Sequence, residues 1–576
     1  MSMTDLDRPA TAVEGRSRLL GALTLAGERL SAALEPLRVR GRTLASLFAR
    51  GSGAAAPYEQ VQQLVHRRLL QSGFVGFLGT LLITLGASQP NSPFTEKIPG
   101  AWFFGIPGAC DISAAAPPCN APVPPPGSGL FFGVVAVYGG MILLMRAWYD
   151  IVRVVSRHRG VPLRRLALVF CAWALPLLVV APLFSRDLYS YAAQGEMMSH
   201  HLNPYLYGPA DLGSSPILTY LPDGLWGHVT SPYGPVFLAL AGWIVEIARH
   251  DPLASVVGMR LLALVGTLLF AVAIPSIARS FGRDGATAFT LAALNPLILL
   301  HLIGGGHNDA LMIGLLAVGY ALARRGQFFL GIVCCALGAV VKVPAIVGVI
   351  YIGWEWIGPG HSPRERVRPT ASALLIAGGV MAAVSVLAGL GWGWISGLSN
   401  PDQIRSWLDP ATALGLAGGK IAGLVGLGGL AHPFLTLTRG GAMLLAVGVA
   451  LRLLLGSEAI GPLRAIGWTL VAFAALGPVV QPWYLTWGFV FLAPVVVGAT
   501  RHVLCVFSAA ACFLGLPGGF VLVDELGVAN PLLVSIASLA LVGLVAVLVV
   551  PRLRRLRRLA AAPAELELAA SVPLHE

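Results

Sequence analysis

The stretch that decides the fold is LALVFCAWALPLLVVAPLF at residues 166–184, which runs directly into the polar cluster SRDLYSY at residues 185–191. The apolar part carries no charge and is long enough to cross a bilayer as a helix, which takes about 20 residues. A charged side chain at the end of such a helix is costly to keep and commonly functional. Asp187, inside the polar cluster, is therefore the first candidate for chemistry.

The whole chain has the composition of a membrane protein. Of its 576 residues, 56% are hydrophobic and 11% are charged, with a mean hydropathy of +0.76, whereas a soluble chain carries about 25% charged residues. Backbone groups in lipid must be bonded within each segment, and the apolar runs are too long for barrel strands, so helices are expected. We predict an all-α polytopic membrane protein with about 14 transmembrane helices. They fall near residues 72–88, 130–148, 164–184, 255–278, 285–303, 307–323, 327–342, 344–357, 369–391, 437–454, 462–479, 483–499, 502–520 and 530–550.

The positive charge lies between the apolar runs. The net charge is +12, and only three of the 39 basic residues are lysines. Short arginine clusters between spans are typical of cytoplasmic loops, so the partner they indicate is the lipid bilayer and not a nucleic acid. The clusters are Arg153 to Arg165, Arg279 and Arg283, Arg324 and Arg325, Arg364 to Arg368, and Arg552 to Arg558.

Each span moves the chain to the opposite side of the membrane, so the order of the spans predicts which segments are cytoplasmic and which are extracytoplasmic. Residues 1–70 are polar and are expected to form a disordered cytoplasmic tail, residues 71–550 a single membrane unit, and residues 551–576 a basic cytoplasmic tail. The run at 235–248 is too short to span comfortably, so we predict a helix lying along the outer interface. With that choice every arginine cluster is cytoplasmic and the long loops 89–129, 185–254 and 392–436 are extracytoplasmic. The protein is expected in the plasma membrane as a multi-pass protein.

Two of the seven cysteines, Cys110 and Cys119, lie in the first of these loops. An extracytoplasmic position permits a disulfide between them, and two free thiols are the alternative. The cysteines show no spacing typical of a zinc site.

The second external loop is rich in aromatic and hydrogen-bonding side chains around Asp187. Such side chains suit sugars, because aromatic faces stack on C–H faces while polar groups bond the hydroxyls. A packed cap without chemistry is the alternative. Lys342 and Arg405 fall on the same side and suit a phosphate, as a point charge and a planar fork. The candidate sugar-binding or acceptor-binding residues on that side are Tyr189, Tyr191, Asn203, Tyr205, Tyr233, His307, Asn308, Asp309, Trp407, Gln481, Trp483 and Tyr484.

These residues form a minimal set for glycosyl transfer from a lipid phosphate. An inverting transfer needs one carboxylate base for the acceptor hydroxyl, and Asp187 is the candidate. A phosphate leaving group needs cationic stabilisation more than a strong acid, which Lys342 and Arg405 would supply. No second acid follows Asp187, since Leu188 and Tyr189 come next, so no divalent metal or other cofactor is expected.

Several motifs, in order along the chain, resemble a known family. They are SRDLYSY at 185–191, NPY at 203–205, SPYGP at 231–235, NPL at 295–297, GHNDALM at 306–312, VKVP at 341–344, RSW at 405–407 and PVVQPWY at 478–484. On these motifs, residues 72–550 resemble the polyprenol-phosphomannose-dependent α-1,6-mannosyltransferases, the MptA/MptB group of GT-C glycosyltransferases, and are closer to MptB.

The resemblance implies a GT-C fold with external loop helices. It also implies transfer of mannose from polyprenyl-phosphate-mannose to a lipid-anchored α-1,6-mannan of lipomannan and lipoarabinomannan, on the outer face of the membrane. The aspartate base of the first large external loop in the family corresponds to Asp187.

Three other functions stay open. One is a transferase of another sugar, such as arabinose or glucose. Another is a lipid-linked sugar transporter or flippase, which internal repeats and broken helices would favour. No repeat is evident, although Lys342 beside Pro344 is compatible with a broken helix. A non-catalytic scaffold would leave Asp187 and the cations without a role.

Overall fold

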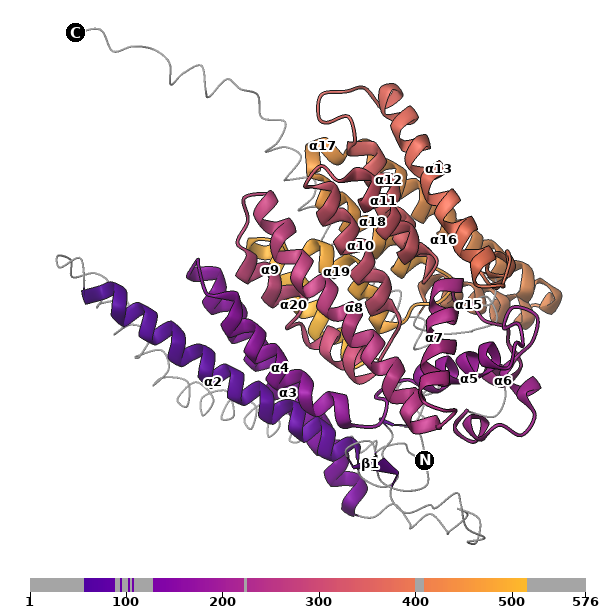
Figure 1. Cartoon of the computed structure of the whole chain (residues 1–576), viewed down its shortest axis with the longest axis horizontal. Helices are drawn as coiled ribbons and strands as arrows, with labels where there is room; N and C mark the ends of the chain where they lie inside the picture. The colour runs from indigo at the N-terminus through magenta and orange to yellow at the C-terminus, as the bar shows by residue number, and fades with distance from the viewer. Residues whose placement is uncertain are drawn as a thin grey trace, which may run out of the picture. The chain divides into compact units, whose positions relative to one another are not determined.

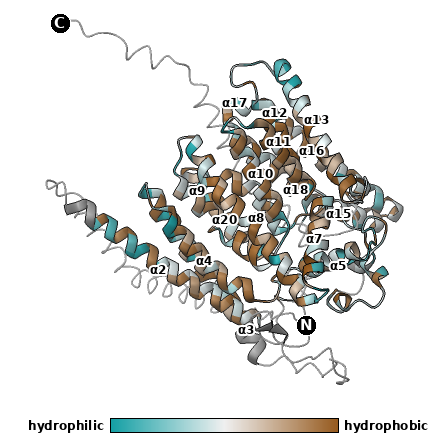
Figure 2. Ribbon diagram, in the orientation of Figure 1, coloured by the Kyte–Doolittle hydropathy of each residue, from teal (hydrophilic) through white to brown (hydrophobic). Residues whose placement is uncertain are grey.

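The computed structural model describes residues 56–88, 94–95, 102–103, 106–107, 128–221, 225–398 and 409–514. The regular elements among these residues are helices, apart from a short antiparallel pair, β1 (Trp102–Phe103) with β2 (Ile106–Pro107), and an isolated bridge between Thr95 and Leu183. Figure 1 shows the helices, and Figure 2 shows that hydrophobic residues dominate them while hydrophilic residues gather at several helix ends and around α5 (Asp187–Ser199). Among the described residues the fold is therefore all-α, as predicted.

Three helices open the described chain: α2 (Ala56–Ala87), α3 (Ser128–Arg157) and α4 (Leu163–Val179). Glycines bring α2 and α3 close together, because an added Cβ on Gly79 would collide with the backbone of α3 at Gly140. On α4, the indole of Trp173 donates to the Gly73 carbonyl of α2 at 2.7 Å. Small residues at such crossings let helices approach where apolar burial gives little driving force between them.

A second group of helices packs around α8 (Pro252–Ser280) and α10 (Asp309–Ala323), which lie side by side (Figure 1). A Cβ on Gly266 or on Gly314 would overlap the backbone of the opposite helix. The two helices therefore touch through their backbones at this crossing. The neighbouring elements are α9 (Gly285–Ala292), η3 (Ile298–Gly304), α11 (Phe328–Ala339), η4 (Val343–Ala345), α12 (Ile346–Glu355) and α13 (Pro363–Leu387).

The segment before α10 is not a regular α-helix. After α9 the helix is interrupted at Asn295 and Pro296. The chain then forms the π-helix η3 and turns through 112° into α10. Gly306 lies in this turn with φ +68°, a conformation that favours glycine. The prediction of one continuous span at 285–303 was therefore wrong in detail, because apolar periodicity does not detect a π-turn.

The loop predicted at 185–254 is built from short helices. They are α5, η1 (Pro209–Leu212), η2 (Pro216–Tyr220), α6 (Leu225–His228) and α7 (Pro235–Ile247). A helix at 235–248 is confirmed as α7, while its position along the outer interface stays a prediction. Gly195 of α5 packs closely against Ala241 of α7. The final described elements are α14 (Gly393–Gly397), α15 (Pro410–Leu424), η6 (Gly428–Leu430), α16 (Ala431–Leu455), α17 (Ser457–Ile460), α18 (Pro462–Leu476), η7 (Pro482–Tyr484), α19 (Leu485–Leu492) and α20 (Gly498–Ala511).

Among the described residues, five helices are long and apolar enough to cross a membrane, and the bent pair η3 and α10 would make a sixth. The predicted number of about 14 spans therefore stays a prediction, because many of the apolar runs form helices broken by proline, glycine or a polar turn. The predicted span at 530–550 and the tail at 551–576 lie outside the described residues.

Two boundary expectations need correction. Helix α2 begins at Ala56, so the tail predicted at 1–70 overlaps its first turns, and residues 1–55 lie outside the described part. The cluster Arg364 to Arg368 was expected in a loop but lies on α13, which begins at Pro363. Arg366 in this cluster is buried, donates to the carbonyls of Trp354 and Gly358, and pairs with Glu458, so it serves packing.

Candidate active site

Asp187 is the first residue of α5 and follows a sharp reversal of the chain. Phe184, just before it, has φ +61°, and its N–H donates to the carbonyl of Phe94 at 2.8 Å. The Oγ of Ser185 then accepts the N–H of Asp187 at 3.1 Å. The apolar helix thus ends in a turn whose hydrogen bonds place the carboxylate at the start of the next helix, where the helix dipole favours negative charge.

A buried arginine holds this turn against the π-helix. Arg260 of α8 is 3% exposed and donates to the carbonyls of Leu178 and Gly304, both at 3.0 Å, and also to that of Val180. The N–H of Leu183 bonds the same Gly304 carbonyl at 3.1 Å. One guanidinium therefore joins the segment before Asp187 to the segment before His307.

Asp187 and His307 meet across this junction. Nδ1 of His307 lies 3.0 Å from Oδ2 of Asp187, and the hydroxyl of Tyr191 donates to the same oxygen at 3.2 Å. Burial raises the pKa of the Asp187 carboxyl, but the bond and charge of His307, the charge of Lys342 and the Ser185 bond outweigh it, so the pKa lies below its ordinary value. The carboxylate is therefore ionised at neutral pH.

Tyr191 and His307 both bond Oδ2 of Asp187, and the side chain of Ser185 also bonds the carboxylate. The side chain of Asp187 is 12% exposed, whereas that of His307 is fully buried. The indole of Trp483 stacks on the His307 ring with the ring centres 3.7 Å apart and the planes 16° apart. This packing fixes the imidazole plane, so Nδ1 is aimed at Oδ2 of Asp187.

Next to this pair lies a second buried ion pair. The ammonium of Lys342 donates to both oxygens of Asp309, at 2.8 and 2.9 Å, and the Trp487 indole N–H donates to Oδ1 of Asp309 at 2.5 Å. The ammonium also lies 4.4 Å from the ring centre of Tyr484. Asp309 is fully buried and Lys342 is 16% exposed. The lysine predicted to bind a phosphate therefore has a carboxylate partner in the structure, and the aspartate predicted to bind sugar serves as its counterion.

Several buried polar atoms beside the two pairs have no hydrogen-bond partner among the described residues. They are Nε2 of His307, Oδ1 and Nδ2 of Asn308, and Nε1 of Trp483. Buried polar groups are nearly always bonded, and exceptions mark places where water or a ligand binds. Their position around Asp187 and His307 makes this the candidate active site.

Other predicted residues have structural partners. The Asn203 side chain accepts the N–H of Tyr205 at 2.9 Å, and the Tyr205 hydroxyl donates to the carbonyl of Tyr233 at 2.7 Å. Tyr233 in turn packs edge-on against Tyr191, and Tyr189 stacks on Tyr220. These side chains build the frame around α5. Gln481 is partly exposed before η7, while Arg405, Trp407, Cys110 and Cys119 lie outside the described residues.

The structure adds residues that the sequence did not indicate. The indole N–H of Trp487 donates to Asp309. In the sequence Trp487 is one more aromatic residue in an apolar helix, so nothing there indicates this bond. His301, on η3, is fully buried between Phe184, His307 and Trp483, and neither ring nitrogen has a partner among the described residues. A lone histidine in an apolar run gives no signal of its role, although π-helices are frequent at functional sites.

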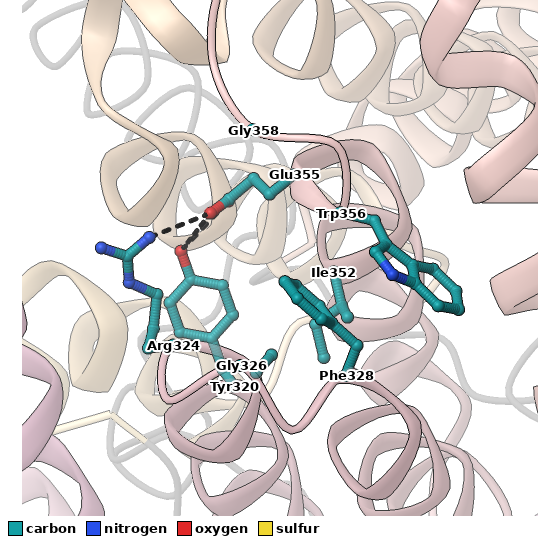
Figure 3. Close-up of a pocket in the computed structure, with 9 residues that line it drawn as sticks. Tyr320, Arg324, Gly326, Phe328, Ile352, Glu355, Trp356 and Gly358 are labelled. Carbon is teal, nitrogen blue, oxygen red and sulfur yellow. Dashed lines mark hydrogen bonds and ion pairs between the residues drawn. The ribbon is translucent and has the colours of Figure 1, made fainter.

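A cavity of about 270 Å³ lies at the other end of α10 and contains none of the predicted residues. Figure 3 shows Glu355 facing Tyr320 and Arg324 there, beside the rings of Phe328 and Trp356. The Tyr320 hydroxyl lies 3.1 and 3.2 Å from the two carboxylate oxygens, and Arg324 lies 3.7 Å away. Its polar groups bond one another, so we place the candidate site at Asp187, where several buried polar atoms have no partner among the residues that the structure describes.

The fold is that of a helical protein with helices long and apolar enough to cross a membrane. Its candidate site pairs the carboxylate of Asp187 with the imidazole of His307, just after an apolar helix ends. Residues 74–358 match the family described as "Alpha-(1->6)-mannopyranosyltransferase, N-terminal domain", and residues 411–550 match the "MptB C-terminal domain". The chain belongs to this α-(1→6)-mannopyranosyltransferase family, which confirms the resemblance and its MptB character.

Named relatives agree with this assignment. The alpha-(1->6)-mannopyranosyltransferase A of Mycobacterium tuberculosis is 30% identical over 437 residues, which cover 73% of this chain and 79% of the relative. A probable alpha-(1->6)-mannopyranosyltransferase of Mycolicibacterium smegmatis is 32% identical, covering 62% and 69%. The alpha-(1->6)-mannopyranosyltransferase B of Corynebacterium glutamicum is 32% identical, covering 64% and 65%. No solved structure matches the chain.

Proposed function

We propose that this protein is an inverting mannosyltransferase that moves mannose from polyprenyl-phosphate-mannose to an α-1,6-mannan acceptor. The mannan would be that of lipomannan or lipoarabinomannan, and the reaction would take place on the outer face of the plasma membrane. The family assignment supports mannosyl transfer. The observation that carries the rest is the ionised carboxylate of Asp187, held by Tyr191 and His307 beside buried polar atoms that have no partner within the described part of the chain.

Asp187 is the general base in this proposal. The 6-hydroxyl of the acceptor mannose would donate to Oδ1, while His307 and Tyr191 hold Oδ2. As the anomeric carbon loses its phosphate and gains oxocarbenium character, the hydroxyl oxygen attacks and its proton passes to the carboxylate. An inverting transfer that ends in an α linkage starts from a β-linked mannosyl phosphate.

Lys342 is the candidate for the leaving phosphate. Its charge is shared with Asp309 before the donor arrives, and the aromatic rings of Tyr484 and Trp487 keep the ammonium in place. A donor phosphate near this pair would gain a charge-assisted bond from the ammonium, while Asp309 stays hydrogen-bonded to Trp487. Arg405 stays the second predicted phosphate ligand.

The unpaired polar atoms supply the sugar contacts. Asn308 offers a donor and an acceptor, and Trp483 offers a donor beside His307. Such groups match the hydroxyls of a mannose held next to Oδ1 of Asp187. In this proposal the base, the phosphate contact and the sugar contacts come from separate side chains.

The experiment that tests the proposal uses the purified chain with radiolabelled polyprenyl-phosphate-mannose and a short α-1,6-mannoside. We expect label in a mannoside one residue longer, with an α-1,6 linkage on analysis of the product. The bent pair η3 and α10 is the feature most compatible with a transporter. Movement of the labelled lipid across a vesicle membrane without formation of a longer mannoside would establish that function and refute the transferase.

A further inference from the structure

We infer that Glu196, His200 and His250 form a binding site for a first-row divalent transition metal, best fitted to Zn²⁺. These three residues, here called the α5 clip, lie away from the Asp187 network. One ligand atom from each falls within 4.8 Å of the others. Glu196 and His200 come from the end of α5, and His250 comes from the turn between α7 and α8.

The distances in the α5 clip are close to those of a metal site. Nε2 of His200 lies 3.2 Å from Oε1 of Glu196, and Nδ1 of His250 lies 3.0 Å from Oε2. Tetrahedral ligands about 2.0–2.1 Å from zinc lie about 3.3 Å from one another. A small outward movement of the imidazoles would therefore admit the ion.

The charge balance of the α5 clip also favours a cation. The side chain of Glu196 is 7% exposed, and the ion pairs recorded for it within the described residues are both with histidine. A buried carboxylate without a cation is costly, because its desolvation is not repaid by neutral donors alone. A divalent ion bound by two neutral imidazoles and one carboxylate would supply that charge.

Access and ligand type agree with a bound ion. The side chains of His200 and His250 are 58% and 41% exposed, so an ion can enter from solvent and a water can complete the coordination. Glu246 lies 3.9 Å from the second nitrogen of His250, an ion-pair distance at which its negative charge adds to the attraction for a cation. Two imidazoles and one carboxylate form a known zinc ligand set, whereas calcium and magnesium prefer oxygen ligands.

A metal in the α5 clip would join the end of α5 to the turn before α8. Helix α5 carries Asp187 at its other end, and α8 carries Arg260, which holds the turn before Asp187. The ion would therefore restrain the helix that positions the proposed base. This role is structural and does not depend on the proposed function, since no step of the transfer involves these residues.

The test is metal binding by the full chain, purified with an affinity tag that contains no histidine. After dialysis against Zn²⁺ and then metal-free buffer, we expect about one zinc per chain by mass spectrometry. Co²⁺ in its place should give the visible absorption of a tetrahedral site. His250→Asn should lower the affinity for Zn²⁺ by at least about 10-fold, the least that losing a partner of a metal site costs.

A matched control comes from a neighbouring histidine. His201 and His250 have similar left-handed backbones, with φ +57° and +61°, and asparagine tolerates that conformation. His201→Asn should leave zinc binding unchanged, and His200→Gln, at an exposed side chain, should weaken it like His250→Asn. Absence of stoichiometric zinc in the wild type would overturn the inference, as would equal zinc content in wild type, His250→Asn and His200→Gln.

Discussion

Replacing Asp187 with asparagine separates the proposed chemistry from the fold. The amide has the shape of the carboxylate, and its oxygen can still accept from Tyr191 and His307 at the positions now 3.2 and 3.0 Å from Oδ2. The position of Oδ1 would then hold an NH₂ group, which cannot take a proton from the acceptor. Folding should change by no more than about 1 kcal/mol, the net value of an ordinary hydrogen bond.

The catalytic loss should be much larger than the change in stability. A positioned general base contributes about 10²- to 10⁴-fold to the rate, equivalent to about 2.7–5.5 kcal/mol in the activation free energy. We expect the upper part of this range, because Asp187 is largely buried and water offers few substitute bases. The measurement is kcat/KM for transfer of labelled mannose to a short α-1,6-mannoside, with thermal unfolding recorded on the same preparation.

The control for this variant is Asp150→Asn. Asp150 lies on α3 and pairs with Arg146, which is 68% exposed, so the same substitution there should leave transfer unchanged. A rate for Asp187→Asn within about 10-fold of the wild type would refute the assignment of the base, since even the weakest general bases contribute more.

Three further outcomes are expected. Because the pKa of Asp187 is lowered, the carboxylate and the stability it adds should persist as pH falls through the ordinary pKa of 3.8. A fall of kcat/KM with decreasing pH that begins above 3.8, while the protein stays folded, would contradict the assignment of Asp187 as the base. Lys342→Ala leaves the buried Asp309 without its cation and should lower the free energy of unfolding by about 3–5 kcal/mol. The double variant Lys342→Met with Asp309→Asn should restore thermal stability but not the KM for the donor. Recovery of both properties would remove the lysine from the site. An added Cβ on Gly234 would overlap a backbone carbonyl, so Gly234→Ala should lower thermal stability by about 1–3 kcal/mol, while Gly139→Ala, with open space around it, should not.

The positions of helices could be predicted well from the sequence where apolar runs are long and end in proline or charge. The run at 255–278 lies within α8, and the short run at 235–248 is α7. The same reasoning failed at 285–303, where Asn295 and Pro296 interrupt the helix and a π-turn follows. Apolar composition is equally high in all three segments, so hydropathy cannot distinguish a straight span from a broken one.

The sequence could predict which residues belong to the candidate site, but not how they contact one another. Asp187, His307 and Lys342 were expected on one side of the membrane, but their pairing could not be. His307 and Asp187 are 120 positions apart, and Lys342 pairs with Asp309 because the 112° turn brings the start of α10 to it. Such geometry depends on the crossing of α8 and α10, which no local pattern records. The pairing of His200 with His250 in the α5 clip could not be predicted for the same reason, since the two histidines are far apart in sequence.

The backbone contact of α8 with α10 at Gly266 and Gly314 has a consequence for how the protein can vary. One guanidinium on α8 holds both the turn before Asp187 and the segment before His307, so the alignment of these two residues depends on how α8 crosses α10. The loops around this site can then diverge in length and composition while Asp187 and His307 keep their alignment. Under the proposed function, acceptor preference could therefore change without disturbing the position of the proposed base.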